Sequence, residues 1–497
     1  MKRLLSILLA LFSIFSCTFQ DYEVGKSMET IITKATGAVY ENDIPYSFQS
    51  VNNKEFWSTC KCFEDRIAAC EVPEEYLSGM TTMALLKTCI DYPLIYCYSA
   101  YENELQAVKA ISEFSNVYME LINRSDAADA IIDFYSKATV RTSVDSLSYG
   151  RNGTSLSLTQ IHFLELLIGS CLIPDLYDET HINFLKESAS MHLSYMYNMP
   201  DIFSIHSTKI ALLINKIIER GSAVPFEEAS RMLCNIEHCQ EPITKSAGDL
   251  IRQVSIRTPF NKTITGFQLE DYSPYESLVN DFNVSNNHPN AILLNCSTYS
   301  YNCHSYAWNM NIGGPTYWIN YIYAGQNQIS NYYTNDAYLT ASSSNANVIL
   351  YNFQSQYSSI HDHSAIPSTN SGMFISKWDH GPLMEHYPSD VPYPGVSSYS
   401  YYKLRSEDNY PNLISGDDLV VVGSTHQYAC SIPAWYNYNY LWEVGNDHEG
   451  ENNDFSVTQV GDYINVTFNR AGEFYVTLKY CVGGYCIASR TLPIVAY

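Results

Sequence analysis

The stretch YNCHSYAW, residues 301–308, combines a cysteine with residues that can begin a helix. Cys303 follows Asn302, a residue type that often caps a helix N-terminus, and residues 303–310 can be helical. A thiol attacks a carbonyl carbon only as its thiolate, and the free amides of a first helical turn favour that negative charge. The sequence therefore predicts a nucleophilic cysteine, with its own backbone N–H placed where an oxyanion would form.

A nucleophilic cysteine needs a base, and the stretch HDHSAI offers histidines at the start of a predicted strand. We expect His363 to accept the thiol proton, because the 60 residues that separate it from Cys303 allow a helix to pack on a sheet. His361 has almost the same spacing and stays an alternative. His304 is adjacent to Cys303, but neighbouring side chains of a helix point in different directions, which favours His363.

A third polar group should orient the imidazole. If the strand that begins at His363 and the strand that ends at Ser376 form a hairpin about a turn at residues 368–371, these two residues lie opposite each other. Opposed residues stand roughly 4.5–5.5 Å apart at their Cβ atoms, which suits a hydrogen bond. A slip of one residue in the register would present Lys377 instead, and Asp379 is a further alternative.

The cysteine content offers a competing interpretation. The chain holds 14 cysteines, and a disulfide between Cys296 and Cys303 would leave no nucleophile. Cys60, Cys62 and Cys70 resemble half of a zinc site, but no second half with suitable spacing follows. We therefore expect disulfides or buried thiols in this chain, and no metal.

The first residues read as an export signal. Lys2 and Arg3 precede an apolar run over residues 4–15, which is too short to span a bilayer comfortably. Two outcomes stay open: an ordinary signal peptide over residues 1–16, or a lipoprotein signal with Cys17 as the lipid-bearing residue. We expect an exported protein of the cell envelope, either secreted or held as an outer-membrane lipoprotein, and any membrane contact would be through that anchor.

The overall charge excludes one class of partner. The formal net charge is -24, with 28 basic and 52 acidic residues. A nucleic-acid partner requires a basic surface, so none is expected.

The pattern of apolar residues divides the 497-residue chain into three regions after the signal. Residues 17–265 read as helical, because apolar residues recur every three or four positions. Residues 266–410 are rich in tyrosine, asparagine and serine, with one compact helix near Cys303 followed by short strands. The strand candidates are Val348–Asn352, Ser364–Pro367 and Met373–Lys377.

Residues 411–497 read as all β. Short strands alternate with turns at the spacing of a sandwich, and Cys430, Trp442 and Cys481 occur in an immunoglobulin-like order. Cys486 follows Cys481 across a predicted hairpin tip, so either Cys430 or Cys486 is a candidate disulfide partner of Cys481.

Several stretches carry a resemblance to a known family. YNCHSYAW, HSAI and ISKWDHGPLMEHYPSDVPY, within residues 296–402, resemble bacterial papain-like cysteine hydrolases of the NlpC and CHAP amidase type. The resemblance implies a nucleophile at Cys303, a base at His363 and a third catalytic residue near Ser376. Relatives usually place histidine, asparagine, glutamine or an acid at that third position, so the serine departs from the pattern. Residues 461–478 resemble PKD-type and related immunoglobulin-like modules, which bind ligands or space other domains.

These observations together predict a multidomain chain with an all-α N-terminal region, a central α+β papain-like domain and a C-terminal immunoglobulin-like sandwich. The expected function is hydrolysis of amide bonds by an exported cysteine hydrolase, in peptidoglycan peptides or another peptide or glycan substrate, without a cofactor. The alternative is a non-catalytic surface protein for adhesion, with a degenerate hydrolase domain. The oligomeric state stays open.

Overall fold

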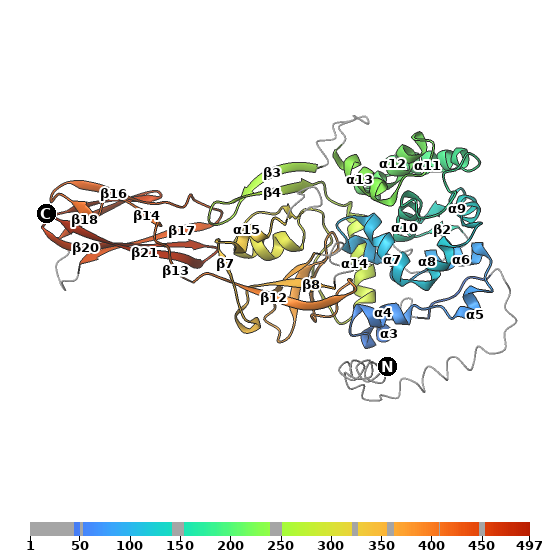
Figure 1. Ribbon diagram of the computed structural model, residues 1–497, viewed down its shortest axis with the longest axis horizontal. Helices are drawn as coiled ribbons and strands as arrows, with labels where there is room; N and C mark the ends of the chain where they lie inside the picture. The colour runs from blue at the N-terminus through green and yellow to red at the C-terminus, as the bar shows by residue number, and fades with distance from the viewer. Residues whose placement is uncertain are drawn as a thin grey trace, which may run out of the picture.

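The computed structural model describes residues 44–49, 53–141, 154–238, 251–320, 327–354, 362–406, 408–446 and 453–497. The molecule is elongated, with helices at one end, two packed β-sheets at the other and a larger antiparallel sheet between them (Figure 1). The expected N-terminal helical region and C-terminal β-rich region are therefore present. The proposed signal peptide, Cys17 and His361 lie outside the described residues. Among the described helices, none has the length and apolarity needed to cross a membrane.

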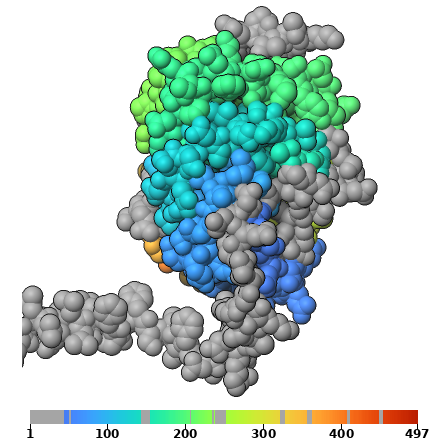
Figure 2. Space-filling model, turned by 90° about the vertical axis from the view of Figure 1, so that its right-hand side faces the viewer, coloured from blue at the N-terminus to red at the C-terminus, as the bar shows by residue number. Residues whose placement is uncertain are grey.

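The helical region is an irregular array of short helices, and its residues form most of the coloured surface in the view of Figure 2. Its helices are α3 (Lys54–Thr59), α4 (Phe63–Ala69), α5 (Glu74–Leu77), α6 (Thr82–Ile90), the 3₁₀ helix η1 (Ile95–Ala100), α7 (Glu104–Phe114), α8 (Asn116–Ile122), α9 (Ala127–Tyr135), α10 (Leu158–Gly169), α11 (Ile182–Tyr197), α12 (Ile205–Glu219) and α13 (Phe226–His238). A short parallel pair, β1 (Thr139–Val140) and β2 (Ser155–Leu156), accompanies them. The helical character that the apolar periodicity predicts for this region is therefore present.

The helical region ends earlier than the sequence predicts. Strands β3 (Ile251–Arg257) and β4 (Thr263–Leu269) form an antiparallel hairpin, and β6 (Trp318–Ile319) extends it to three strands. The expected helical structure up to residue 265 is therefore wrong over these strands, and the boundary at residue 266 falls inside β4. Alternation of β-branched and polar residues over 254–257 is the pattern that indicates a strand here.

The central sheet has seven strands, and each neighbouring pair is antiparallel. Their order is β5 (Ile292–Asn295), β11 (Leu383–His386), β10 (Phe374–Lys377), β9 (Ser364–Pro367), β8 (Val348–Phe353), β12 (Val396–Leu404) and β7 (Tyr338–Thr340). The other elements of this part are helix α14 (Pro274–Asn287), the helical turns η3 (Ser305–Asn309), η4 (Met310–Ile312) and η6 (Ser343–Asn345), and helix α15 (Ser330–Tyr333). The strand over Ser364–Pro367 has the predicted bounds.

One face of the central sheet packs directly on the helical region. Ile349, Tyr351 and Ala365 belong to the same buried cluster as the helical core. A buried polar chain fastens the two parts: Arg66 of α4 pairs with Asp390 at 2.8 Å, and Asp390 bonds His288 Nδ1 at 2.6 Å. Because one hydrophobic core crosses the expected boundary, the helical region and the sheet form one body.

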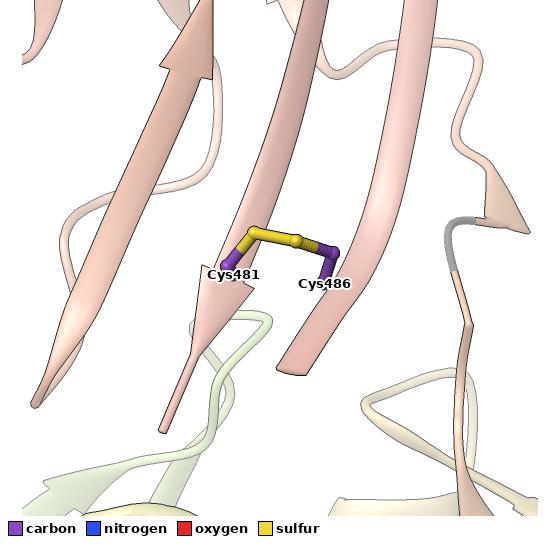
Figure 3. The surroundings of a disulfide bond; sticks show 2 residues. All are labelled: Cys481 and Cys486. Carbon is purple, nitrogen blue, oxygen red and sulfur yellow. A yellow bond between two sulfur atoms is a disulfide. The ribbon is translucent and has the colours of Figure 1, made fainter. Parts of the chain in front are cut away.

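The C-terminal part consists of two mainly antiparallel sheets that pack face to face, and two short strands of one sheet pair in parallel with their neighbour. One sheet contains β13 (Asp408–Asn409), β15 (Leu419–Val420), β17 (Tyr438–Asn446), β20 (Gly472–Val482) and β21 (Tyr485–Ala496), and the other contains β14 (Ile414–Ser415), β16 (Thr425–Cys430), β18 (Phe455–Val460) and β19 (Tyr463–Phe468). A disulfide joins Cys481 to Cys486 across the tip of the β20–β21 hairpin, as Figure 3 shows. Of the two candidate partners of Cys481, the structure selects Cys486, and Cys430 is a free thiol.

Candidate active site

Cys303 begins a helix that runs through η3 and η4 to Ile312. Asn302 caps this helix as predicted, since its side-chain oxygen accepts hydrogen bonds from the backbone N–H of Ser305 at 3.0 Å and of Ile319 at 3.3 Å. The Asn302 amide also donates to the carbonyl of Ile319 at 2.7 Å. Cys303 therefore occupies the first helical turn, in the position that the sequence predicts.

The Cys303 thiol lies against the start of strand β9. Its Sγ is 3.9 Å from the backbone oxygen of Asp362, and the side chain has no exposed surface. Burial raises the pKa of the thiol above its ordinary value, while the charge and hydrogen bond of His304 oppose this rise. Cys303 and Cys296 are both free thiols, so the disulfide that would remove the nucleophile is not formed.

His304 is the histidine whose charge and hydrogen bonding lower the pKa of the Cys303 thiol against the effect of burial. Its Nδ1 lies 2.8 Å from the hydroxyl of Ser364, and its Nε2 lies 3.4 Å from a carboxylate oxygen of Asp362. Burial opposes a charge on this ring, but the negative charges of Cys303 and Asp362 raise its pKa well above the usual value. The expectation that His304 points away from Cys303 is wrong, because both side chains reach the same strand, β9.

His363 immediately precedes strand β9 and packs on tyrosines of the core that the helical region shares with the central sheet. The register pairs Leu350 with Ser364, and the next step along the ladder is a hydrogen bond from the Tyr351 N–H to the His363 carbonyl. Because neighbouring side chains of a strand alternate between faces, Ser364 faces the Cys303 helix and His363 faces the helical region. The His363 ring centroid is 4.8 Å from those of Tyr351 and Tyr393. Its role as the base stays a prediction.

Ser376 does not lie opposite His363. Strand β10 pairs with β9 through Phe374 with Pro367 and Ile375 with Ile366, which aligns Ser376 with Ala365. The predicted register is therefore wrong by two residues, because the turn is two residues longer than residues 368–371 and ends at Met373.

The Ser376 hydroxyl is held by partners other than His363. It lies 2.7 Å from Nε2 of His386 and accepts a hydrogen bond from the Trp378 indole at 3.1 Å. The prediction that Ser376 orients His363 required these two residues to pair across the hairpin, and they do not.

Lys377 fastens the loop behind the site. Its buried ammonium group donates hydrogen bonds to the backbone oxygens of Thr298, Asp379 and Gly381. Burial lowers its pKa to about 7, although the charge of Asp379 opposes this change. Lys377 thus holds backbone carbonyls, and the sequence-based alternative that it orients His363 lacks support.

Two carboxyl groups with opposite pKa shifts flank the thiol and imidazole. Asp362 is about half exposed, and although burial raises its pKa, the neighbouring His304 charge and hydrogen bond lower it below the usual value. Asp379 is buried, and burial raises its pKa to about 7. Its backbone is left-handed, with a φ of 47°, a strained conformation for aspartate that often occurs at functional sites. Asp362 is therefore the ionised partner of His304.

The sequence did not point to Asp362, although a signal was present. HDHSAI places an acid between two histidines on an incipient strand, and strand alternation puts Asp362 on the face of Ser364. That face is the one on which the Cys303 helix packs. The pairing of His304 with the Asp362 carboxylate thus follows from the strand period once the face of the sheet is known.

Replacing Asp379 by asparagine should lower the pH at which Cys303 becomes reactive. The Asp379 charge raises the pKa of the thiol, and with a pKa of about 7 this group is ionised in the alkaline range where thiols titrate. We expect the midpoint to fall by up to roughly one unit. Alkylation of Cys303 by iodoacetamide, followed by mass spectrometry of its peptide over a pH series, measures this midpoint. A midpoint that stays or rises would contradict the assigned charge effect.

Comparison with known proteins adds little to this geometry. No protein-family model matches the chain, and no curated protein is significantly similar to it. A solved I-band fragment of titin, I67–I69, matches 32% of this chain and 59% of the fragment, with 10% identity and a TM-score of 0.12. A TM-score this low carries no argument about fold or function. The function must therefore be argued from the site.

Proposed function

We propose that this protein is a cysteine hydrolase that cleaves amide bonds, with Cys303 as the nucleophile and His304 as the base. The observation that carries the proposal is that Cys303 and His304 both reach Asp362, where the thiol lies 3.9 Å from the backbone oxygen and Nε2 of His304 lies 3.4 Å from the carboxylate. A nucleophile, an adjacent base and a group that orients the base are the parts required for this chemistry. A cysteine helix packed on an antiparallel sheet also supports the papain-like class that the sequence resembles.

The residues have defined roles in this reaction. His304 takes the thiol proton, and the Cys303 sulfur attacks the carbonyl carbon of the substrate to form a tetrahedral oxyanion. When this species collapses, the C–N bond breaks and the proton from His304 leaves with the amine, so that a thioester remains on Cys303. Water, deprotonated by His304, then adds to the thioester, the C–S bond breaks, and the acid is released while the proton returns to the sulfur.

Substrate and location rest on the sequence alone. The export signal and the family resemblance favour the peptides of peptidoglycan as substrate and the cell envelope as the place of action. The immunoglobulin-like resemblance of the terminal sheets belongs to the same proposal. The complete burial of Cys303 adds one requirement, because side chains over the thiol must move before a carbonyl can reach it.

The same burial favours a second function, that of a non-catalytic surface binding protein. In that case Cys303 would be an inert core thiol with a raised pKa. Cys296 and Cys303 are both free thiols, which argues against a binding protein in which a disulfide between them blocks the nucleophile.

Incubation of the full chain with purified peptidoglycan separates the two functions. A hydrolase releases new amino groups with time, and mass spectrometry of the quenched protein finds an acyl adduct on the Cys303 peptide. A binding protein co-sediments with peptidoglycan and releases no amines. Absence of both release and adduct, with the protein folded, would overturn the proposal.

A further inference from the structure

The tip of the β20–β21 hairpin touches the end of the Cys303 helix. The tip residues Gly483 and Gly484 both have a left-handed backbone, with φ values of 55° and 88°. A Cβ atom on Gly483 would lie 2.7 Å from the carbonyl carbon of Ile312 and closer still to its oxygen. Gly484 has open space at the same atom. The contact with the helix therefore requires glycine at position 483 and does not require it at position 484.

A second loop of the terminal sheets meets the next helix residue. A Cβ atom on Gly313, whose φ is 90°, would lie 2.7 Å from the side-chain nitrogen of Asn437. The Gly483 N–H donates a hydrogen bond to the Asn437 carbonyl at 3.0 Å, so the two loops brace each other. The Cys481–Cys486 disulfide closes the hairpin immediately behind this tip (Figure 3). Together they hold the helix end at Ile312 and Gly313.

The contact extends inward to the thiol and imidazole. Trp308 and Ile312 share a buried cluster with Tyr480 and Val482 of the terminal sheets. The Trp308 indole donates a hydrogen bond to the Ser364 hydroxyl at 2.9 Å, and that hydroxyl lies 2.8 Å from Nδ1 of His304. A packed path therefore runs from the hairpin tip through Trp308 and Ser364 to the proposed base.

We propose that the disulfide-closed hairpin tip positions the Cys303–His304 couple, with Gly483 as a positioning residue. The helix that carries the couple is short and begins with widened turns before it tightens, and so short a helix depends on packing for its stability. The terminal sheets supply that packing, so they act as part of the site's frame and not as a separate accessory module. The inference rests on the proposed function only for its effect on hydrolysis.

Two adjacent alanine substitutions in the full chain test this inference. Gly483→Ala and Gly484→Ala impose the same type of left-handed backbone penalty, but only the first places a Cβ against Ile312. Iodoacetamide alkylation of Cys303 is followed over a pH series by mass spectrometry, and melting temperatures are recorded for both variants. We expect Gly483→Ala to raise the midpoint pH of Cys303 alkylation by at least roughly half a unit, because His304 moves away from the thiol. Gly484→Ala should keep the wild-type midpoint.

A second variant covers the case in which Gly483→Ala does not fold. The double substitution Cys481→Ser and Cys486→Ser opens the hairpin behind the tip and should move the midpoint in the same direction. Equal midpoints in wild type and in every folded variant of the tip would overturn the inference. The midpoint pH of alkylation is measured without substrate. A failure to hydrolyse peptidoglycan would therefore refute the proposed function, while the comparison of midpoints would still test whether the hairpin tip positions Cys303 and His304.

Discussion

Cys303→Ala should abolish amine release from peptidoglycan, with a loss of at least roughly 10⁴-fold, because removal of a nucleophile leaves only what binding and oxyanion stabilisation provide. The variant should still fold, since alanine removes only the buried sulfur atom. The rate of amine release from purified peptidoglycan by equal concentrations of folded protein measures the effect.

The chain provides a matched control for this substitution. Cys296 is also a free thiol, but it is exposed and lies seven residues earlier. Cys296→Ala should retain the wild-type rate. Equal rates in Cys303→Ala and wild type would remove the mechanism, and equal losses in both variants would indicate a general effect of cysteine removal.

His304→Gln should lower kcat by roughly 10²–10⁴-fold, the range expected when a general acid–base group is lost. Glutamine can still bond the Ser364 hydroxyl, but it cannot accept the thiol proton or return it to the amine. Steady-state rates on peptidoglycan fragments measure this loss, and melting temperature reports on folding.

His363→Gln separates the structural account from the interpretation of the sequence alone. His363 immediately precedes strand β9 and packs on core tyrosines, so its replacement should cost less than about tenfold in a variant that folds. The opposite ranking, with His363→Gln inactive and His304→Gln active, would restore His363 as the base.

The sequence predicts the position of Cys303 because local rules decide it. Asn302 caps the helix, the apolar period marks the helical region, and Ser364–Pro367 has the composition of a buried strand. The sequence leaves Cys430 and Cys486 as candidate disulfide partners of Cys481, and the observed partner, Cys486, lies across a glycine-rich tip from it. Each of these features depends on residues close together in the chain.

The sequence fails where distant residues decide the outcome. The hairpin register depends on the turn length, and two extra residues place Ser376 beside Ala365 instead of His363. The choice of His304 depends on which face of β9 the Cys303 helix covers, and no local pattern reports this. The core that the helices share with the central sheet, and the second core that the central part shares with the terminal sheets, likewise arise from contacts between separate regions.

The pH dependence of Cys303 alkylation, compared between wild type and His304→Gln, tests the central claim most directly. His304 lowers the pKa of the thiol against the effect of burial, so its loss should move the midpoint to higher pH and slow alkylation at neutral pH. The same midpoint in both proteins, or a lower one in His304→Gln, would show that this imidazole does not act on the thiol.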